Sequence, residues 1–310
     1  MCAIYGFVSY KHLLTGKQLK ELVRRLSVAS VVRGKDASGI AYVKNDEIFI
    51  YKTPKSAHEV DFFFPADTTV PTGHTRWTTQ GNAKDNYNNH PFPGKTADGR
   101  FALSHNGILY NDKELAYEYD LPKTKIKTDT YVAVQLLERQ NRLNADTISE
   151  MCETVCGNFV FTILDDKNTL YIAKGDNPLC LIHFKELGLY VYSSTTDIMR
   201  EALDGFFLAK EAVEIIPDDD GEMIAIDKTG NLTRKRFEPS DDWDEYSIFG
   251  RRLFDYDDDW LSDIYDISEY DLELLRDYGY CDEEIEMICQ DSSLLRMCIE
   301  EARMYMGVYE

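Results

Sequence analysis

The chain has 310 residues, of which 44% are hydrophobic and 29% are charged, and its formal net charge is −21. This length and hydrophobic content predict a folded protein with one large domain plus an appendage, or with two modest domains. No stretch has the roughly 18 to 20 uninterrupted apolar residues that a membrane span requires, and the start of the chain lacks the layout of a signal peptide. We therefore expect a cytoplasmic protein with no membrane partner.

Negative charge is concentrated in the C-terminal segment. Residues 238–310 hold 23 acidic and 5 basic side chains, whereas residues 1–237 hold 32 acidic and 29 basic ones. Such a segment repels a phosphate backbone, which argues against a nucleic-acid partner. Seven scattered cysteines fit a reducing compartment better than a disulfide framework. Cys152 and Cys156 lie four residues apart without a second Cys/His pair at zinc spacing, so we expect no metal site and no cofactor.

Residues 1–237 are predicted to form strands with two or three helices between them. Alternating apolar and polar residues between Gly, Asn and Asp turns predict strands over 4–10, 40–53, 100–109, 158–166, 169–175, 187–194 and 222–237. Helical spacing over 15–30 places four apolar side chains on one face: Leu19, Leu22, Val23 and Leu26. A second helix over 128–140 carries Val132, Leu136 and Leu137, with Thr128 as its N-cap. Antiparallel sheets covered by helices accommodate these elements.

The domain organisation follows from the change in composition. Residues 1–237 are expected to form the main domain. Residues 238–262 mix acids with aromatic side chains, which predicts an acidic aromatic linker lying on the body's surface or on a partner. Residues 263–310 are predicted to form a small module of three short helices, the first of which starts with a capping box at Ser268 and Asp271.

Cys2 is the first candidate for chemistry. Methionine is usually trimmed before a small residue, which would leave a thiol and a free α-amine on Cys2. An α-amine titrates near pH 8, so it can accept the thiol proton and return it to a leaving amine. The alternative is that a cysteine at this position is incidental.

Five further motifs accompany Cys2 in the body. They are "RGKDASGIAY" at 33–42, "GHTRWTTQG" at 73–81, "NNHP" at 88–91, "SHNGILYN" at 104–111 and "KTDTYV" at 127–132. Together with "MCAIYG", and in this order, they resemble the class II glutamine amidotransferase domain of the N-terminal nucleophile (Ntn) hydrolases, as in glucosamine-6-phosphate synthase and amidophosphoribosyltransferase. The resemblance covers residues 2 to about 237. It implies an α+β fold, a four-layer αββα Ntn-hydrolase sandwich of two antiparallel sheets, here with a small acidic C-terminal helical appendage.

The resemblance also implies a role for each motif residue. Cys2 would attack the side-chain amide of glutamine, while the Asn106 side chain and the Gly107 backbone N–H would form the oxyanion hole. Arg76 would bind the substrate α-carboxylate and Asp129 the α-ammonium group. Arg33 would have a supporting role, in which it orients the N-terminal turn. Trp77 and Thr79 would belong to the loop that closes over glutamine.

Some of these residues have a simpler interpretation. Arg76 and Asp129 could form an ordinary ion pair, and Asn106–Gly107 could be a hairpin turn, since Asn-Gly is common there. The three histidines of the motifs are expected to be structural: His74, His90 and His105.

The sequence departs from the family pattern at three positions. Ala3 replaces a glycine, Ala37 replaces a serine, and Gln80 stands where glucosamine-6-phosphate synthase has a histidine. The added methyl of Ala3 is tolerable if its φ is negative.

No acceptor signature accompanies these motifs. The sequence has no SGGxDS-type pyrophosphate loop, no acidic phosphoribosyl-pyrophosphate loop and no serine-rich sugar-phosphate loop. We therefore expect ammonia released from L-glutamine to reach a separate synthetase or transferase. Two alternatives stay open, a stand-alone amidohydrolase acting on another amide and a non-catalytic binding module of the same fold.

Overall fold

The computed structural model describes residues 2–240, 267–278, 280, 285, 288, 289 and 292–306. The chain divides into two compact units, Met1–Ile248 and Phe249–Glu310. The expected boundaries at 237 and 262 stay predictions, because the linker beyond residue 240 lies outside the described residues. Among the described residues, no helix has the length and apolar character needed to span a bilayer.

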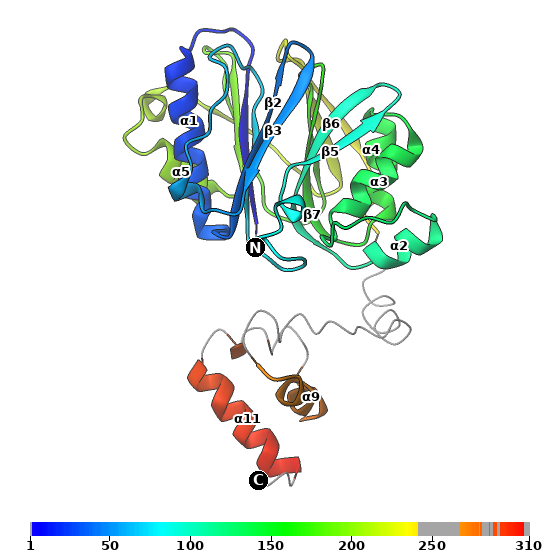
Figure 1. The fold of residues 1–310 in the computed structure, drawn as a ribbon. Coiled ribbons are helices and arrows are strands. Elements are labelled where there is room, and N and C mark those ends of the chain that lie inside the picture. Colours follow the sequence, from blue (N-terminus) through cyan, green and yellow to red (C-terminus); the bar gives the residue numbers. More distant parts are fainter. Residues whose placement is uncertain are drawn as a thin grey trace. The chain divides into compact units, whose positions relative to one another are not determined.

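The first unit is built on two antiparallel sheets (Figure 1). One sheet has seven strands in the order β11-β9-β10-β1-β4-β2-β3. Their bounds are β1 Ala3–Ser9, β2 Ala37–Lys44, β3 Glu47–Thr53, β4 Thr72–Arg76, β9 Cys180–Phe184, β10 Leu189–Ser193 and β11 Glu214–Ile216. The other sheet has six strands in the order β13-β12-β8-β7-β6-β5. Their bounds are β5 Phe92–Thr96, β6 Gly99–Leu109, β7 Gly157–Asp165, β8 Leu170–Lys174, β12 Glu222–Ile226 and β13 Leu232–Arg236.

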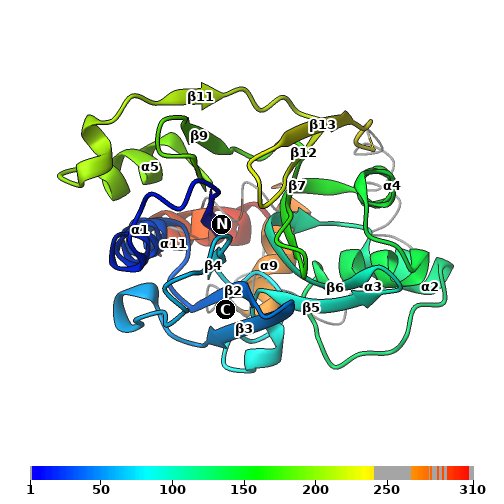
Figure 2. The ribbon, with the colours of Figure 1, turned by 90° about the horizontal axis from the view of Figure 1, so that it is seen from above.

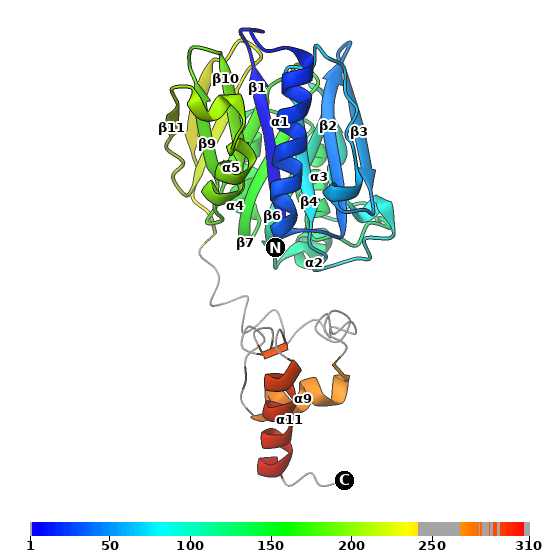
Figure 3. The same ribbon diagram turned by 90° about the vertical axis from the view of Figure 1, so that its left-hand side faces the viewer.

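Helices cover the outer face of each sheet (Figures 2 and 3). Helices α1 (Gly16–Ala29) and α5 (Thr196–Leu203) pack on the seven-stranded sheet, and α2 (Asp112–Glu118), α3 (Tyr131–Gln140) and α4 (Ala145–Thr154) pack on the six-stranded one. Three apolar clusters fill the three spaces between these four layers. The predicted α+β architecture with two antiparallel sheets is confirmed.

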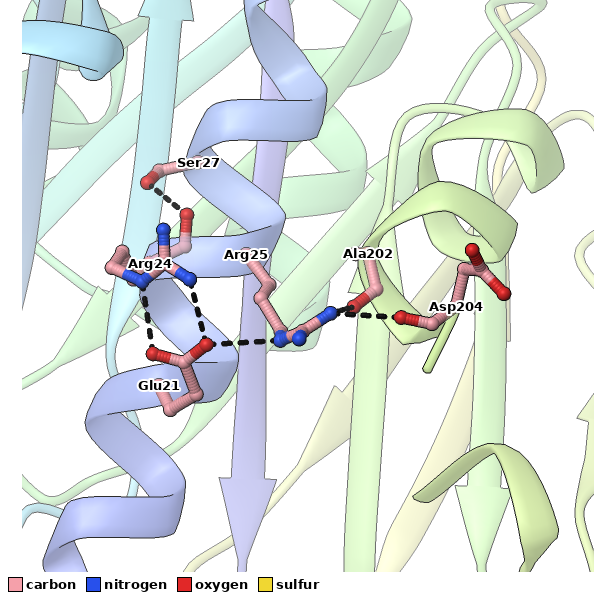
Figure 4. A network of polar contacts seen from close by, with 6 residues as sticks. All are labelled: Glu21, Arg24, Arg25, Ser27, Ala202 and Asp204. Atoms are coloured by element: carbon pink, nitrogen blue, oxygen red, sulfur yellow. Dashed lines mark hydrogen bonds and ion pairs between the residues drawn. The ribbon is translucent and has the colours of Figure 1, made fainter. Parts of the chain in front are cut away.

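Helix α1 shows how the sequence builds one outer layer. Thr15 caps its start through a capping box with Gln18, and its four predicted apolar side chains are buried in the cluster against the sheet. Arg25 joins α1 to the end of α5 (Figure 4). Its guanidinium contacts Glu21 at 2.9 Å and donates to the carbonyl oxygen of Asp204, also at 2.9 Å. These contacts fix the helix pair over the sheet.

The predicted start of the helix over 128–140 is wrong. Helix α3 begins at Tyr131, and its N-cap, Thr130, makes no side-chain capping bond. Thr128 does not cap the helix, because its hydroxyl donates to the carbonyl oxygen of Asn88 at 2.9 Å. The Thr128 side chain is therefore bonded to the loop before β5, while its backbone carbonyl accepts the N–H of Tyr131 at 3.0 Å.

The second unit contains helices α9 (Glu269–Tyr278) and α11 (Ser292–Met306), which pack through an apolar cluster. As expected from the sequence, the Ser268 hydroxyl accepts the backbone N–H of Asp271 at 3.1 Å. The Arg303 guanidinium contacts the Asp271 carboxylate at 2.8 Å, so one charged contact joins the two helices. The start of the middle predicted helix lies outside the described residues.

Candidate active site

Cys2 lies directly before β1, in the middle of the seven-stranded sheet. Ala3 pairs with Thr75 of the antiparallel strand β4, so Cys2 and Arg76 are neighbours at one end of the sheet, the lower end in Figure 1. The Cys2 side chain is buried, and its Sγ donates to the carbonyl oxygen of Trp77 at 3.4 Å. Burial raises the pKa of the Cys2 thiol. The resting site therefore holds a protonated thiol that needs a base to become a nucleophile.

Arg33 joins the Cys2 backbone to the second sheet. Its Nε donates to the carbonyl oxygen of Cys2 at 2.9 Å, and its Nη2 donates to Oδ1 of Asn106 at 3.4 Å. Arg33 ends the short 3₁₀ helix η1 (Ser30–Arg33), which follows α1 directly. One guanidinium thus sets the position of the Cys2 backbone and the orientation of the Asn106 amide.

Asn106 and Gly107 lie inside β6 and not in a hairpin turn, which excludes the simpler interpretation of this dipeptide. Asn106 is fully buried, and its backbone carbonyl accepts from Nδ2 of Asn177 at 2.9 Å. Its own Nδ2 is buried and finds no acceptor among the described residues. A buried amide donor without a partner is costly in a folded protein, so this group is set up to bind an atom that is not part of the protein.

Gly107 is required by its surroundings. Its φ of 149° is a conformation that other residues rarely adopt, and a Cβ at this position would lie 1.8 Å from the carbonyl oxygen of Asn158 on β7. The glycine lets β6 and β7 approach closely beside Asn106.

Arg76 is 2% exposed, and neutral oxygen atoms of the described chain accept its hydrogen bonds. Its Nη1 donates to Oδ1 of Asn89 at 2.8 Å, and its Nη2 donates to the backbone carbonyls of Gln80 and Gly81. Among the described residues, no carboxylate lies within the 4.0 Å of an ion pair. Burial lowers the pKa of the guanidinium, an effect that Cys2 and Asp129 oppose. A buried cation held only by neutral oxygens is prepared to bind an anion.

Asp129 is also buried, and it is held by backbone and hydroxyl donors. Its Oδ2 accepts the N–H of Leu109 at 2.7 Å, and its Oδ1 accepts from the Thr130 hydroxyl at 3.4 Å. Burial raises the pKa of the Asp129 carboxyl, whereas these donors and Arg76 lower it. Arg76 and Asp129 influence each other without direct contact, so the simple ion pair considered above is absent.

The two loop residues relate to the site in different ways. The carbonyl oxygen of Trp77 accepts from the Cys2 thiol. The Trp77 residue is 37% exposed, and Nζ of Lys35 lies 6.0 Å from the centroid of its ring. Thr79 is partly exposed, and no hydrogen bond of the described chain ties it to Cys2, Arg76 or Asp129. The structure therefore brings the Trp77 backbone to the thiol and shows no direct polar contact of Thr79 with these three described residues.

The three motif histidines are buried and have structural contacts, as expected. The Thr130 hydroxyl lies 3.1 Å from Nε2 of His90 and 2.9 Å from Nδ1 of His105. The His74 Nε2 contacts the carbonyl oxygen of His105 at 3.0 Å. Burial lowers the pKa of all three, to about 3 for His74 and to about 4 for His105. Their rings are neutral at physiological pH. Across the described residues, no cluster of three His, Cys, Asp or Glu side chains could hold a metal ion.

The chain is similar to a described protein family and to several known proteins. Residues 74–200 match the family described as "Glutamine amidotransferase domain". A glutamine–fructose-6-phosphate aminotransferase (isomerizing) from Staphylococcus aureus is 32% identical over 248 residues, which cover 73% of this chain and 39% of that protein. The corresponding protein of Staphylococcus epidermidis is 35% identical over 188 residues, or 58% of this chain and 30% of that protein.

Solved structures extend the comparison to the fold. The glutamine phosphoribosylpyrophosphate amidotransferase of B. subtilis superposes with a TM-score of 0.59 and 21% identity, over 76% of this chain and 49% of that one. A structure described as the allosteric regulatory enzyme of purine biosynthesis gives the same TM-score and coverage at 20% identity. The chain carries a class II glutamine amidotransferase domain. It spans about two-fifths of the length of the Staphylococcus aureus relative.

The three departures from the family pattern fit the structure of the amidotransferase domain. Ala3 is fully buried in β1 and is not among the residues with positive φ, so its methyl group adds no backbone strain. Ala37 is buried opposite Arg76 in β2. Gln80 accepts a hydrogen bond from Arg76 through its backbone carbonyl oxygen, which any residue can supply.

Two residues of the amidotransferase domain that act on Arg76 were not predicted from the sequence. Asn89 belongs to the "NNHP" motif, in which a role was predicted only for the histidine. Lys52 lies in a strand predicted from simple alternation, and nothing in that pattern distinguishes a lysine that faces the interior.

Proposed function

We propose that the protein hydrolyses the side-chain amide of L-glutamine to glutamate and ammonia, with Cys2 as an N-terminal nucleophile after removal of Met1. The observation that carries the proposal is the buried, unpartnered Nδ2 of Asn106, which Arg33 links to the Cys2 backbone. A donor of this kind stabilises an oxyanion in a site from which water is excluded. The membership in the amidotransferase family supports glutamine as the substrate.

The chemistry follows from the groups at the site. The α-amine of Cys2 accepts the thiol proton, and Sγ attacks the side-chain carbonyl carbon of glutamine. The negative charge on the carbonyl oxygen is stabilised by Nδ2 of Asn106 and by the backbone N–H of Gly107. The amine returns its proton to the leaving nitrogen, and ammonia departs as the thioester forms. Water then hydrolyses the thioester to glutamate and restores the thiol.

Two buried charges would select the amino-acid end of the substrate. Arg76 has no carboxylate within 4.0 Å among the described residues, so it can bind the α-carboxylate of glutamine. The Asp129 carboxylate, held by the N–H of Leu109, can bind the α-ammonium group. Together these two side chains would bind the α-carboxylate and the α-ammonium group of a free amino acid. This favours glutamine over a peptide amide as the substrate.

The test compares two cysteine variants. We expect Cys2→Ala to abolish glutamate release from glutamine, because the nucleophile is lost. Cys180→Ala should retain it, because Cys180 lies in β9, which β10 separates from β1, and is buried in the apolar cluster that α1 covers. A glutamine-mimicking diazo-ketone should label Cys2 alone, and the intact mass should lack Met1. Equal rates for wild type and Cys2→Ala, or full activity on another amide with glutamine inert, would contradict the proposal.

We also propose that the ammonia passes to a separate acceptor enzyme. The proposal is supported by the charge of residues 238–310, which hold 23 acidic and 5 basic side chains. The acidic segment after residue 237 supplies a charged surface for docking. Glutamine labelled with ¹⁵N in its amide should transfer the label to the product of a candidate synthetase even in excess unlabelled ammonium. Loss of the label to the bulk ammonium pool with every candidate would contradict direct delivery.

A further inference from the structure

Lys52 lies in β3 with its amino group directed into the protein. Ile48 and Ile50, which precede it on the same side of the strand, pack against the apolar cluster between the two sheets. The Lys52 Nζ donates to the backbone carbonyl of Asn89 at 2.6 Å and lies 4.8 Å from the centre of the Phe92 ring. A lysine normally keeps its ammonium group in water, so this placement calls for an explanation.

Asn89 connects Lys52 to Arg76. Its backbone oxygen accepts from Lys52, and its side-chain Oδ1 accepts from Nη1 of Arg76 at 2.8 Å. Its Nδ2 donates to the carbonyl of Ala83 at 2.8 Å and to Oδ1 of Asn86 at 3.1 Å. The Asn86 amide in turn donates to the backbone carbonyl of Lys52 at 2.7 Å. The loop before β5 is thus closed on Lys52 at two points, and it presents one oxygen to Arg76.

The charges around Lys52 do not balance. The charged or titratable groups of the described chain that act on it are Arg76 from β4 and His90 from the loop before β5. His90 is neutral because burial keeps its pKa well below its usual range. No described carboxylate lies within 4.0 Å of Lys52 or Arg76. The carboxylates of Asp129 and Asp36 act on Arg76 only from a greater distance. Two neighbouring cations therefore share one asparagine, and neither forms a direct ion pair with a described carboxylate.

We propose that Lys52 is a positioning residue for the substrate-binding arginine: it fixes Asn89, which orients Arg76, and its charge strengthens carboxylate binding there. The inference rests on the proposed glutaminase function and adds to it a determinant of affinity outside the family motifs. Lys52 acts through Asn89 and takes no part in the bond-making steps. Its loss should therefore affect the binding of the amino acid and leave the chemistry on the thiol unchanged.

The arrangement makes substrate binding depend on pH. Burial, followed by the charge of Arg76, lowers the pKa of Lys52 to about 8. Above that pH the free protein loses one of its two cations at this site, so a carboxylate ligand binds more weakly. The change lies in affinity, because Lys52 does not contact the reacting atoms.

The experiment measures the inhibition constant of L-glutamate, the product, from pH 6.5 to 9.5. It uses wild type, Lys52→Met, Lys52→Arg and the matched control Lys44→Met, whose side chain is exposed on the adjacent strand β2. At pH 7 we expect Lys52→Met to raise the inhibition constant of glutamate and the KM for glutamine about tenfold, with kcat within about twofold. Lys52→Arg should restore binding, and Lys44→Met should match wild type.

The pH profile provides a second readout, which compares wild type with the conservative variant Lys52→Arg. The wild-type inhibition constant should rise through pH 8, whereas the profile of Lys52→Arg should lack this step. The α-ammonium group of glutamate titrates equally in all variants, so ratios between profiles isolate Lys52. The inference is overturned if the ratio of the wild-type to the Lys52→Arg inhibition constant does not change with pH, or if folded Lys52→Met binds glutamate as tightly as wild type. The glutaminase proposal stands in either case. A wild-type protein that binds neither glutamine nor glutamate overturns both.

Discussion

The two ends of the Asn106 side-chain amide have different surroundings. Its Oδ1 accepts from Arg33, which also holds the Cys2 carbonyl, and its Nδ2 is left without an acceptor in the described chain. An asparagine suits this position because one planar group carries both an acceptor and a donor. Fixing the acceptor end on Arg33 therefore fixes the direction of the free donor.

The oxyanion role of Asn106 can be tested by removing the donor alone. Asn106→Asp keeps the shape and the acceptor for Arg33 but loses the N–H groups. We expect kcat for glutamine hydrolysis to fall about 10²- to 10³-fold, with KM changed little, because the lost interaction forms only in the transition state.

Asn231→Ala serves as the control for this variant, since its side chain is exposed in the turn between β12 and β13. Steady-state kinetics of glutamate release on the two variants and wild type provide the measurement. A kcat for Asn106→Asp within threefold of wild type would rule out the assigned role.

At the level of elements, the close approach of β6 and β7 depends on Gly107. We expect Gly107→Ala to lower the free energy of unfolding by more than about 3 kcal/mol, because it combines strained backbone with a clash against the carbonyl oxygen of Asn158. The matched control is Gly205→Ala, at a φ of 63° with no atom within 4 Å of the added Cβ. It should cost only about 1 kcal/mol.

Urea unfolding of the two glycine variants measures the difference directly. Equal destabilisation by Gly107→Ala and Gly205→Ala would show that positive φ alone explains both, and that the strand contact is not tight. A folded Gly107→Ala protein with wild-type stability would contradict the described path of β6.

Regular elements with clear periodicity were predictable from the sequence, and the short ones were not. The helix over 15–30 and the strands of the two hairpins, β2–β3 and β12–β13, are confirmed. Helices α2 and α4 were not predicted. Helix α2 has only 7 residues, too few to establish a helical period. The strand β4 was missed because "TGHTR" is fully buried on both faces and shows no alternation.

The candidate site could also be predicted only in part, because its contacts join residues that are far apart in the sequence. Ordered motifs identified the residues near Cys2, but the simpler interpretations of Asn106–Gly107 and of Arg76 with Asp129 could be excluded only from three-dimensional contacts. Lys52 and Asn89 are far apart in sequence, and their contact arises where the loop before β5 closes on β3. Sequence periodicity carries no information on such a contact.

At the scale of the whole molecule, the interior of the first unit contains three buried histidine rings and a buried threonine hydroxyl. The rings of His74 and His90 lie 4.1 Å apart by their centroids, and Thr130 contacts His90 and His105. These groups are buried between layers that are otherwise apolar. Hydrogen bonding makes their burial tolerable only while the rings stay neutral.

The stability of the protein should therefore fall in mild acid. The folded-state pKa values of His74 and His105, about 3 and about 4, lie below the value near 6.5 of an unfolded histidine. The unfolded state binds more protons below pH 6.5, so acid favours unfolding by about 2 kcal/mol per histidine at pH 5. Asp112 acts in the opposite direction, because burial and the nearby Asp129 raise its pKa to about 6.

Because of this opposition, the test compares variants and not the wild-type slope alone. The free energy of unfolding in urea is measured at pH 7 and pH 5 for wild type, His105→Gln and His58→Gln. His105→Gln should lose about 2 kcal/mol less than wild type between the two pH values, whatever its stability at pH 7. His58→Gln, exposed in the 3₁₀ helix Ala57–Glu59, should lose as much as wild type. An equal loss for His105→Gln would mean that His105 is protonated without cost in the fold and that the polar interior admits water there.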